Sequence, residues 1–137
     1  MKTIVLDTSA LMRLFIPDGP IPDGLDQLIL DAEKDEVDLL APNLIIIESA
    51  QVLLKKSNQE LLTKDEAESL FGDIRSLPIR LFEPAEFIKT ALSIAIDQNI
   101  TVYDALFVSI AQYYSATLVT VDSKLKKTAI KLKLNTL

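Results

Sequence analysis

Hydrophobic and polar positions follow two patterns along the chain. Short uninterrupted apolar runs are typical of strands buried on both faces, and apolar positions three or four residues apart are typical of helices with one buried face. The first pattern, as in Thr3-Ile4-Val5-Leu6, recurs between segments of the second pattern. The runs predict strands at residues 3–6, 37–41, 79–82 and 117–121, and residues 132–137 would add a fifth short strand.

Helix start signals divide the remaining sequence. Asp23 and Asn43 are candidate N-caps, Thr63 with Glu66 forms a capping-box pattern, and Thr101 with Asp104 repeats it. Pro84 is suited to a first helical position. The expected helices cover residues 9–15, 24–34, 44–54, 64–76, 84–99, 105–114 and 123–131. Residues 17–24 contain closely spaced Pro and Gly and are expected to form a loop, which is either a plain connection or a gate or partner surface beside a site.

Strands that alternate with helices predict an α/β fold, with a central, mainly parallel sheet of about five strands and helices on both faces. At 137 residues, with about half of them apolar, the chain has the length and core content of a single domain covering residues 1–137. Two expected helices separate the third and fourth strands. One of them must therefore cross the sheet edge or lie obliquely.

The absence of two residue types limits the chemistry. The chain has no cysteine and no histidine. Thiolate nucleophiles, cysteine-type zinc sites and the usual histidine general base are therefore excluded. Any catalysis must depend on carboxylates and hydroxyls, and carboxylates favour hard cations such as Mg²⁺ or Mn²⁺.

The charge distribution bears on the partners. The formal net charge of −6 opposes a nucleic-acid partner, but the segment from Ser123 to the C-terminus has five lysines and no acid. These lysines either hold a phosphate backbone or complement the dipole of the last helix. No segment has transmembrane length and the N-terminus has no signal-peptide pattern, so we expect a cytoplasmic protein with no membrane partner.

Four acids occupy positions typical of a site. Asp7 and Asp122 each follow a predicted strand, where ligands bind in open α/β sheets, and Glu48 and Asp104 lie near the starts of helices that can lean over the same edge. Each also has a purely structural interpretation. Asp7 and Asp122 can cap the helices that follow them, Asp104 can complete its capping box, and Glu48 can lie on a solvated face.

Taken together, these residues resemble the PIN-domain family, in particular the toxins of VapBC toxin–antitoxin systems. The resemblance covers the whole chain. Its segments are Val5-Leu6-Asp7-Thr8-Ser9-Ala10, Pro42-Asn43 followed by Glu48, Val102-Tyr103-Asp104-Ala105-Leu106 and Val119-Thr120-Val121-Asp122. One departure is Ser-Lys-Leu after Asp122, where many relatives have an aromatic residue.

The resemblance implies a three-layer α/β/α domain that cleaves RNA phosphodiester bonds as a Mg²⁺- or Mn²⁺-dependent endoribonuclease. The family's acidic positions fall on Asp7, Glu48, Asp104 and Asp122, and its hydroxyl positions on Ser9 or Thr8 and on Thr120. It also implies an antitoxin partner. The apolar helix from Leu44 to Leu54 suits a homodimer and an antitoxin groove equally well, and we expect a homodimer.

The four acids have different expected roles in binding metal ions and water. Four neighbouring carboxylates repel one another, so one or two divalent ions would relieve the conflict and activate a water molecule. We expect Asp7 to anchor the principal ion, with Asp104 and Asp122 completing its shell. Glu48 would bind a second ion or orient the water.

Other protein classes fit less well. A haloacid-dehalogenase-like phosphatase needs a second Asp at the position of Ser9, and a response-regulator receiver needs adjacent acids after the first strand. A stand-alone PIN-fold nuclease of RNA processing and a catalytically silent PIN-fold binding module remain as alternatives.

Overall fold

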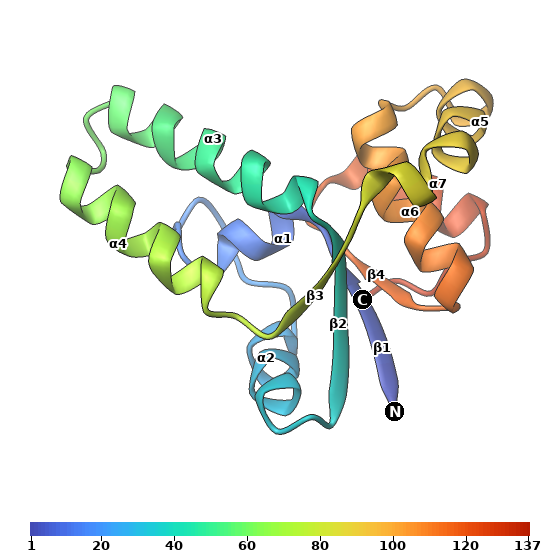
Figure 1. Cartoon of the computed structure of the whole chain (residues 1–137), viewed down its shortest axis with the longest axis horizontal. Helices are drawn as coiled ribbons and strands as arrows, with labels where there is room; N and C mark the ends of the chain where they lie inside the picture. Colours follow the sequence, from blue (N-terminus) through green and yellow to red (C-terminus); the bar gives the residue numbers. More distant parts are fainter.

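The computed structural model describes all residues, 1–137, and has a four-stranded parallel sheet at its centre (Figure 1). The strand order is β3-β2-β1-β4, and every neighbouring pair is parallel. The strands are β1 (Lys2–Leu6), β2 (Val37–Pro42), β3 (Ile79–Phe82) and β4 (Thr117–Val119). The α/β class and the parallel sheet predicted from the apolar runs are confirmed.

Helices cover both faces of this sheet. Figure 1 shows α1 to α4 on one side of the strands and α5 to α7 on the other, which is the predicted three-layer arrangement. The helices are α1 (Thr8–Arg13), α2 (Leu25–Glu33), α3 (Leu44–Asn58), α4 (Lys64–Arg75), α5 (Ile88–Gln98), α6 (Val102–Tyr114) and α7 (Ser123–Lys131), with a 3₁₀ turn, η1 (Pro84–Glu86).

The central strands are apolar because both of their faces are covered. Ile4, Val5 and Leu6 of β1 are fully buried, and so are Leu40 and Ala41 of β2. They belong to one core of 33 buried hydrophobic residues. Burying apolar side chains of this kind stabilises the fold by about 1.5–3 kcal/mol for each large residue. The core fixes the position of the carboxyl end of β1, where Asp7 follows.

The prediction of a fifth strand at residues 132–137 is wrong. The segment forms one isolated bridge, Leu118 to Thr136, and the Leu118 amide donates to the Asn135 carbonyl at 2.9 Å. The chain turns at Lys133, whose φ is +63°, so too few residues remain to continue the pairing. β4 also ends at Val119, earlier than predicted, and the amides of Val121 and Asp122 bond to side-chain hydroxyls instead of to a neighbouring strand.

The connection from β3 to β4 explains the two helices between them. α5 and α6 pack against each other at 113°, and α6 contacts β1 and β2 while α5 lies outside it. The additional helix is thus accommodated by packing α5 on α6, which itself packs on the sheet. No single helix is long and apolar enough to cross a membrane. The bent pair of α5 and α6 has the length and apolar composition of a membrane span, but residues 105–111 of α6 are buried in the interior of the domain.

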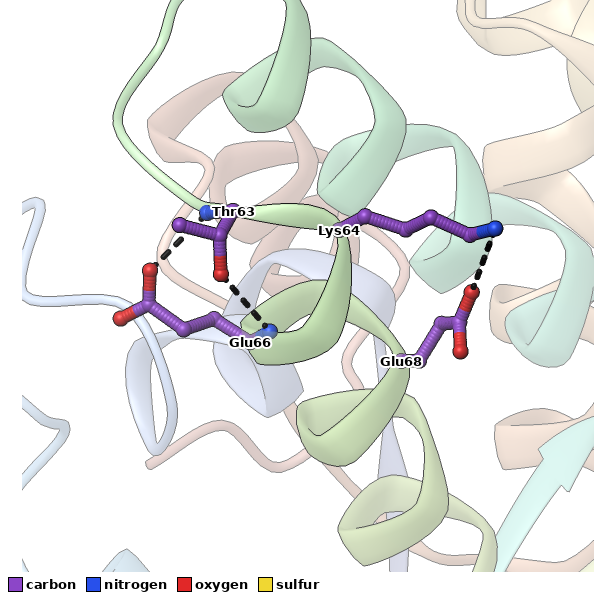
Figure 2. Close-up of polar contacts among 4 residues, drawn as sticks. All are labelled: Thr63, Lys64, Glu66 and Glu68. Atoms are coloured by element: carbon purple, nitrogen blue, oxygen red, sulfur yellow. Dashed lines mark hydrogen bonds and ion pairs between the residues drawn. The ribbon is translucent and has the colours of Figure 1, made fainter.

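The helix starts show which capping signals are reliable. Thr63 and Glu66 form the predicted capping box, with hydrogen bonds of 2.9 and 3.1 Å between each side chain and the other residue's amide (Figure 2). Asp23 does not cap α2, because Gly24 occupies the N-cap with φ of +81°. Asn43 makes no side-chain cap, because it is itself helical and its amide donates to the Phe82 carbonyl.

Candidate active site

A cleft of about 490 Å³ opens beyond the carboxyl end of β1. All four predicted acids line it: Asp7, Glu48, Asp104 and Asp122. They come from the end of β1, from α3, from α6 and from the residue before α7. The structure therefore brings together the set that the sequence singled out, from segments far apart in the chain.

Asp7 is the most enclosed of the four. It has a relative exposure of only 5%. Its Oδ1 accepts hydrogen bonds from the Ser9 hydroxyl at 2.8 Å and the Ala10 amide at 2.9 Å, and its Oδ2 accepts from Thr120 at 2.5 Å. Asp7 thus caps α1, as the structural interpretation expected, and also presents a carboxylate to the cleft.

Burial raises the pKa of Asp7 from its ordinary value of 3.8 to about 6. The hydrogen bonds from Thr120, Ala10 and Ser9 lower the pKa and the negative charge of Asp104 raises it, but the loss of hydration dominates. A buried carboxyl with a pKa raised this far is typical of functional sites, where such groups bind a cation or take part in proton transfer.

Ser9 and Thr120 link the two ends of the site. Their hydroxyl oxygens are 3.2 Å apart. The Ser9 hydroxyl also accepts from the Val121 amide at 3.1 Å, and the Thr120 hydroxyl accepts from the Asp122 amide at 3.0 Å. Each hydroxyl therefore donates to Asp7 and accepts from the backbone beside Asp122. Both lie where the sequence placed supporting hydroxyls.

Thr8 supports a different acid. Its hydroxyl donates to Oε1 of Glu48 at 2.7 Å. Burial raises the pKa of Glu48, and the nearby negative charge of Asp104 raises it further, while the Thr8 hydrogen bond opposes both effects. The sequence offered Ser9 or Thr8 as the hydroxyl of this segment. In the structure, both are used, on separate carboxylates.

Asp104 forms only half of the expected capping box. Its amide donates to the Thr101 hydroxyl at 3.1 Å, but its carboxylate makes no hydrogen bond to the Thr101 amide. Burial raises the pKa of Asp104, as does the negative charge of Asp122, whereas contact with Thr101 and the positive charge of Lys124 lower it. The carboxylate is therefore not bonded to the Thr101 amide, and it lies close enough to Asp122 to be affected by its charge.

Asp122 caps α7 with one oxygen. Its Oδ1 accepts from the Lys124 and Leu125 amides at 2.9 and 3.1 Å, and its Oδ2 makes no hydrogen bond within the chain. Asp122 can therefore cap α7 with Oδ1 and still use Oδ2 in the cleft, because a carboxylate has two acceptor oxygens. The structural and functional interpretations of this residue are thus compatible.

The donor types of the cleft fit a hard divalent cation. They are carboxylates and hydroxyls, and the carboxylates lie close enough to raise one another's pKa. As the side chains stand, however, no group of three or more acids is arranged to hold a metal ion together. The cleft therefore offers the ligand type and the charge without a closed coordination shell.

The sequence interpretation missed several residues of the cleft. Gln51 lies three residues after Glu48 and Phe107 three after Asp104, so helical spacing alone places them on the faces that carry those acids. Arg13 likewise lies four residues after Ser9 on α1. Asp18 belongs to the loop at 17–24, and no periodicity in the sequence indicates that this loop reaches the cleft.

Residues 4–131 match the sequence profile of the PIN domain. The chain belongs to the PIN-domain family. This PIN domain is 28% identical over 124 residues to Ribonuclease VapC3 of Pyrobaculum aerophilum, and the match covers 89% of this chain and 91% of that protein.

Solved structures agree on the fold of this PIN domain. PAE2754 from Pyrobaculum aerophilum aligns with a TM-score of 0.69 at 22% identity, over 93% of this chain and 86% of that one. FitAcB from Neisseria gonorrhoeae aligns with a TM-score of 0.55 at 18% identity, over 98% and 96% of the two chains.

Proposed function

We propose that this PIN domain is a metal-dependent endoribonuclease and the toxin of a toxin–antitoxin pair. The observation that carries the proposal is the convergence of Asp7, Glu48, Asp104 and Asp122 on one cleft, with the pKa of Asp7 raised to about 6. Family membership and the similarity to a protein named Ribonuclease VapC3 support the choice of RNA as the substrate.

One or two Mg²⁺ or Mn²⁺ ions would be held by the four acids. Such an ion, when bound, lowers the pKa of a water molecule and offsets the charge of the attacked phosphate. Asp7 is the anchor in this proposal, because it is buried and both of its oxygens are fixed by hydrogen bonds. Asp104 and Asp122 would complete the shell of the principal ion, and Glu48 would bind a second ion or orient the water.

The chain's own hydroxyls keep these carboxylates in place. Ser9 and Thr120 donate to Asp7, and Thr8 donates to Glu48. Each hydrogen bond favours the ionised carboxylate and lowers its pKa, which opposes the effect of burial. The hydroxyls therefore hold Asp7 and Glu48 ready to bind a cation near neutral pH.

We also propose a homodimer formed through α5. Ile88, Leu92 and Ile96 follow one another at four-residue spacing and are 44%, 51% and 72% exposed. Two antiparallel copies of α5 would cover both apolar stripes.

The remaining partners are an RNA substrate and an antitoxin protein, and the proposed location is the cytoplasm. The apolar segment from Leu44 to Leu54 divides between two environments. Ile45 and Leu53 belong to the core, whereas Ile47 and Leu54 are 69% and 51% exposed. The exposed pair leaves an apolar surface on α3 beside the cleft, whose wall includes Glu48 and Gln51 of the same helix.

The deciding experiment is cleavage of single-stranded RNA with Mn²⁺ or Mg²⁺, using Asp7→Asn and Asp104→Asn as inactive variants and Asp65→Asn, on the exposed face of α4, as the matched control. We expect cleavage by the wild type and by the control only, and none in EDTA. Cleavage that survives both cleft substitutions or chelation would overturn the mechanism.

A second measurement does not depend on turnover. Binding of Mn²⁺ to the native state raises the melting temperature by mass action. We expect a rise for the wild type and a much smaller rise for Asp7→Asn. Equal rises for both would remove Asp7 from the metal site. A catalytically silent binding module would also show the rise in melting temperature with Mn²⁺. It would bind RNA but would not cleave it.

A further inference from the structure

Arg13 is the only basic residue that lines the acidic cleft. Five of the cleft's lining residues are acids, namely the four described above and Asp18. Arg13 forms no ion pair with any of them, and Asp18 is instead bound by Lys56 at 2.7 Å. A guanidinium that shares a cleft with five acids and pairs with none of them is available for an anion that comes from outside the protein.

The loop at 17–24 holds this guanidinium by one edge. Nη1 of Arg13 donates to the Pro20 carbonyl at 3.3 Å. A Cβ atom at Gly19 would lie 1.9 Å from Nη1 and 2.6 Å from Cζ, so the guanidinium occupies the space that a side chain at position 19 would need. This one hydrogen bond to the chain leaves most of the five N–H donors of the fork unused.

We propose that Arg13 binds a phosphate of the RNA that neighbours the phosphate to be cleaved. The proposal rests on the ribonuclease function proposed above. α1 rises about 1.5 Å per residue, so Arg13 lies roughly 9 Å along the helix from Asp7. The contact with Pro20 keeps the guanidinium at this far end of the cleft, while the acids gather around Asp7.

The chemistry of the guanidinium suits this role. Its planar fork offers parallel donors that match two phosphate oxygens. RNA that enters a cleft with five carboxylates is repelled wherever no cation covers them. Arg13 supplies the only basic side chain in the lining of the cleft, so it helps to set where the strand lies and favours substrates long enough to carry a second phosphate.

Substrate length is the sharpest test. We would compare kcat and KM of the wild type, Arg13→Gln, Arg13→Lys and the matched control Arg75→Gln on a diribonucleotide with a single phosphate and on a hexaribonucleotide. Arg75 is an exposed residue at the end of α4, outside the cleft. For Arg13→Gln we expect KM on the hexanucleotide to rise roughly tenfold, with a distinctly smaller change on the dinucleotide, and Arg13→Lys to recover part of the loss.

Gly19→Ala moves the guanidinium without changing the charge. Gly19 does not have a positive φ, so alanine fits its backbone and the Arg13 side chain must give way. We expect the same selective loss on the hexanucleotide as in Arg13→Gln, and no further loss when both substitutions are combined. Gly72→Ala is the control, because nothing lies within 4 Å of a Cβ atom at that position.

Equilibrium binding separates this proposal from the ribonuclease function. The probe is a fluorescein-labelled hexaribonucleotide in Ca²⁺, measured by anisotropy at several salt concentrations, with a gel to check that the RNA stays intact. Loss of one phosphate contact should lower the slope of log K against log salt by about 0.7 for Arg13→Gln. Absent cleavage by the wild type would overturn the ribonuclease function alone. An unchanged affinity and slope, or equal losses on both substrate lengths, would overturn the role of Arg13.

Discussion

The Thr120 hydroxyl donates to Oδ2 of Asp7 at 2.5 Å although the two residues are 113 positions apart in the chain. The contact exists because β1 pairs with β4 in parallel, so that both strands end at the same edge of the sheet. The same hydroxyl accepts from the Asp122 amide. Thr120 therefore fixes the relative position of two of the four acids.

Thr120→Val should impair the site without removing an acid. The substitution takes a hydrogen bond from Asp7 and leaves the Asp122 amide without its partner, which costs about 1–3 kcal/mol of stability. Because the Thr120 hydrogen bond lowers the pKa of Asp7, its loss should raise that pKa further. We expect the acidic limb of the pH–rate profile to move to higher pH. Thr120→Ser keeps the hydroxyl and should behave as the wild type; a shift in both variants would contradict this role.

Asp7 should make the metal-free protein less stable as the pH rises. Its pKa in the folded state is about 6 against an ordinary value of 3.8, so between these pH values the folded protein binds more protons than the unfolded chain. The stability that the protonated group contributes is fully present below pH 4 and is lost as the pH rises through 6, by about 3 kcal/mol.

Asp7→Asn has no such titration. Urea unfolding of both proteins in EDTA at several pH values between 4 and 7 gives the free energy of unfolding for each. We expect the wild type to lose stability relative to Asp7→Asn over this interval. A difference that does not change with pH would show that the carboxyl of Asp7 is not desolvated.

Much of the site followed from local sequence patterns. The buried run Ile4 to Leu6 identifies a central strand, and its end identifies Asp7 as a rim residue. Gln51 and Phe107 could have been predicted from the sequence, because helical spacing places them on the same helix faces as Glu48 and Asp104. The approach of the 17–24 loop to Arg13 depends on packing between segments and has no local signal.

The errors also have local physical causes. Asp23 and Asn43 are good capping residue types, but a cap requires a non-helical residue whose side chain turns back to the helix. The Leu25 amide bonds to the Pro22 carbonyl, which leaves Gly24 to make the turn, and the Asn43 amide bonds to β3. The sheet and the loop decide these helix starts, and neither is visible in the sequence of the helix itself.

Leu92→Asp should separate the proposed dimer. A charge at the centre of the α5 stripe would face its own copy across the symmetry axis, so we expect the variant to sediment as a monomer and the wild type as a dimer. Ile130→Asp, at another exposed apolar residue, is the control. A wild-type monomer at high concentration would refute the interface.

The capping box of α4 gives a prediction about stability alone. Thr63→Ala removes the hydroxyl that accepts from the Glu66 amide and should lower the free energy of unfolding by about 1 kcal/mol. Glu68→Ala removes only an exposed ion pair with Lys64 at 3.8 Å and should change stability little (Figure 2). Chemical denaturation measures both, and equal losses would argue against the cap.

The pairing of β1 with β4 matters while the protein is being made. Nascent chains fold from the N-terminus as they are synthesised. A ribosome that has translated β1, β2 and β3 has produced Asp7, Glu48 and most of the sheet, but neither Thr120 nor Asp122. The unfinished polypeptide therefore has no complete cleft, and the proposed ribonuclease activity can arise only after Asp122 has been translated.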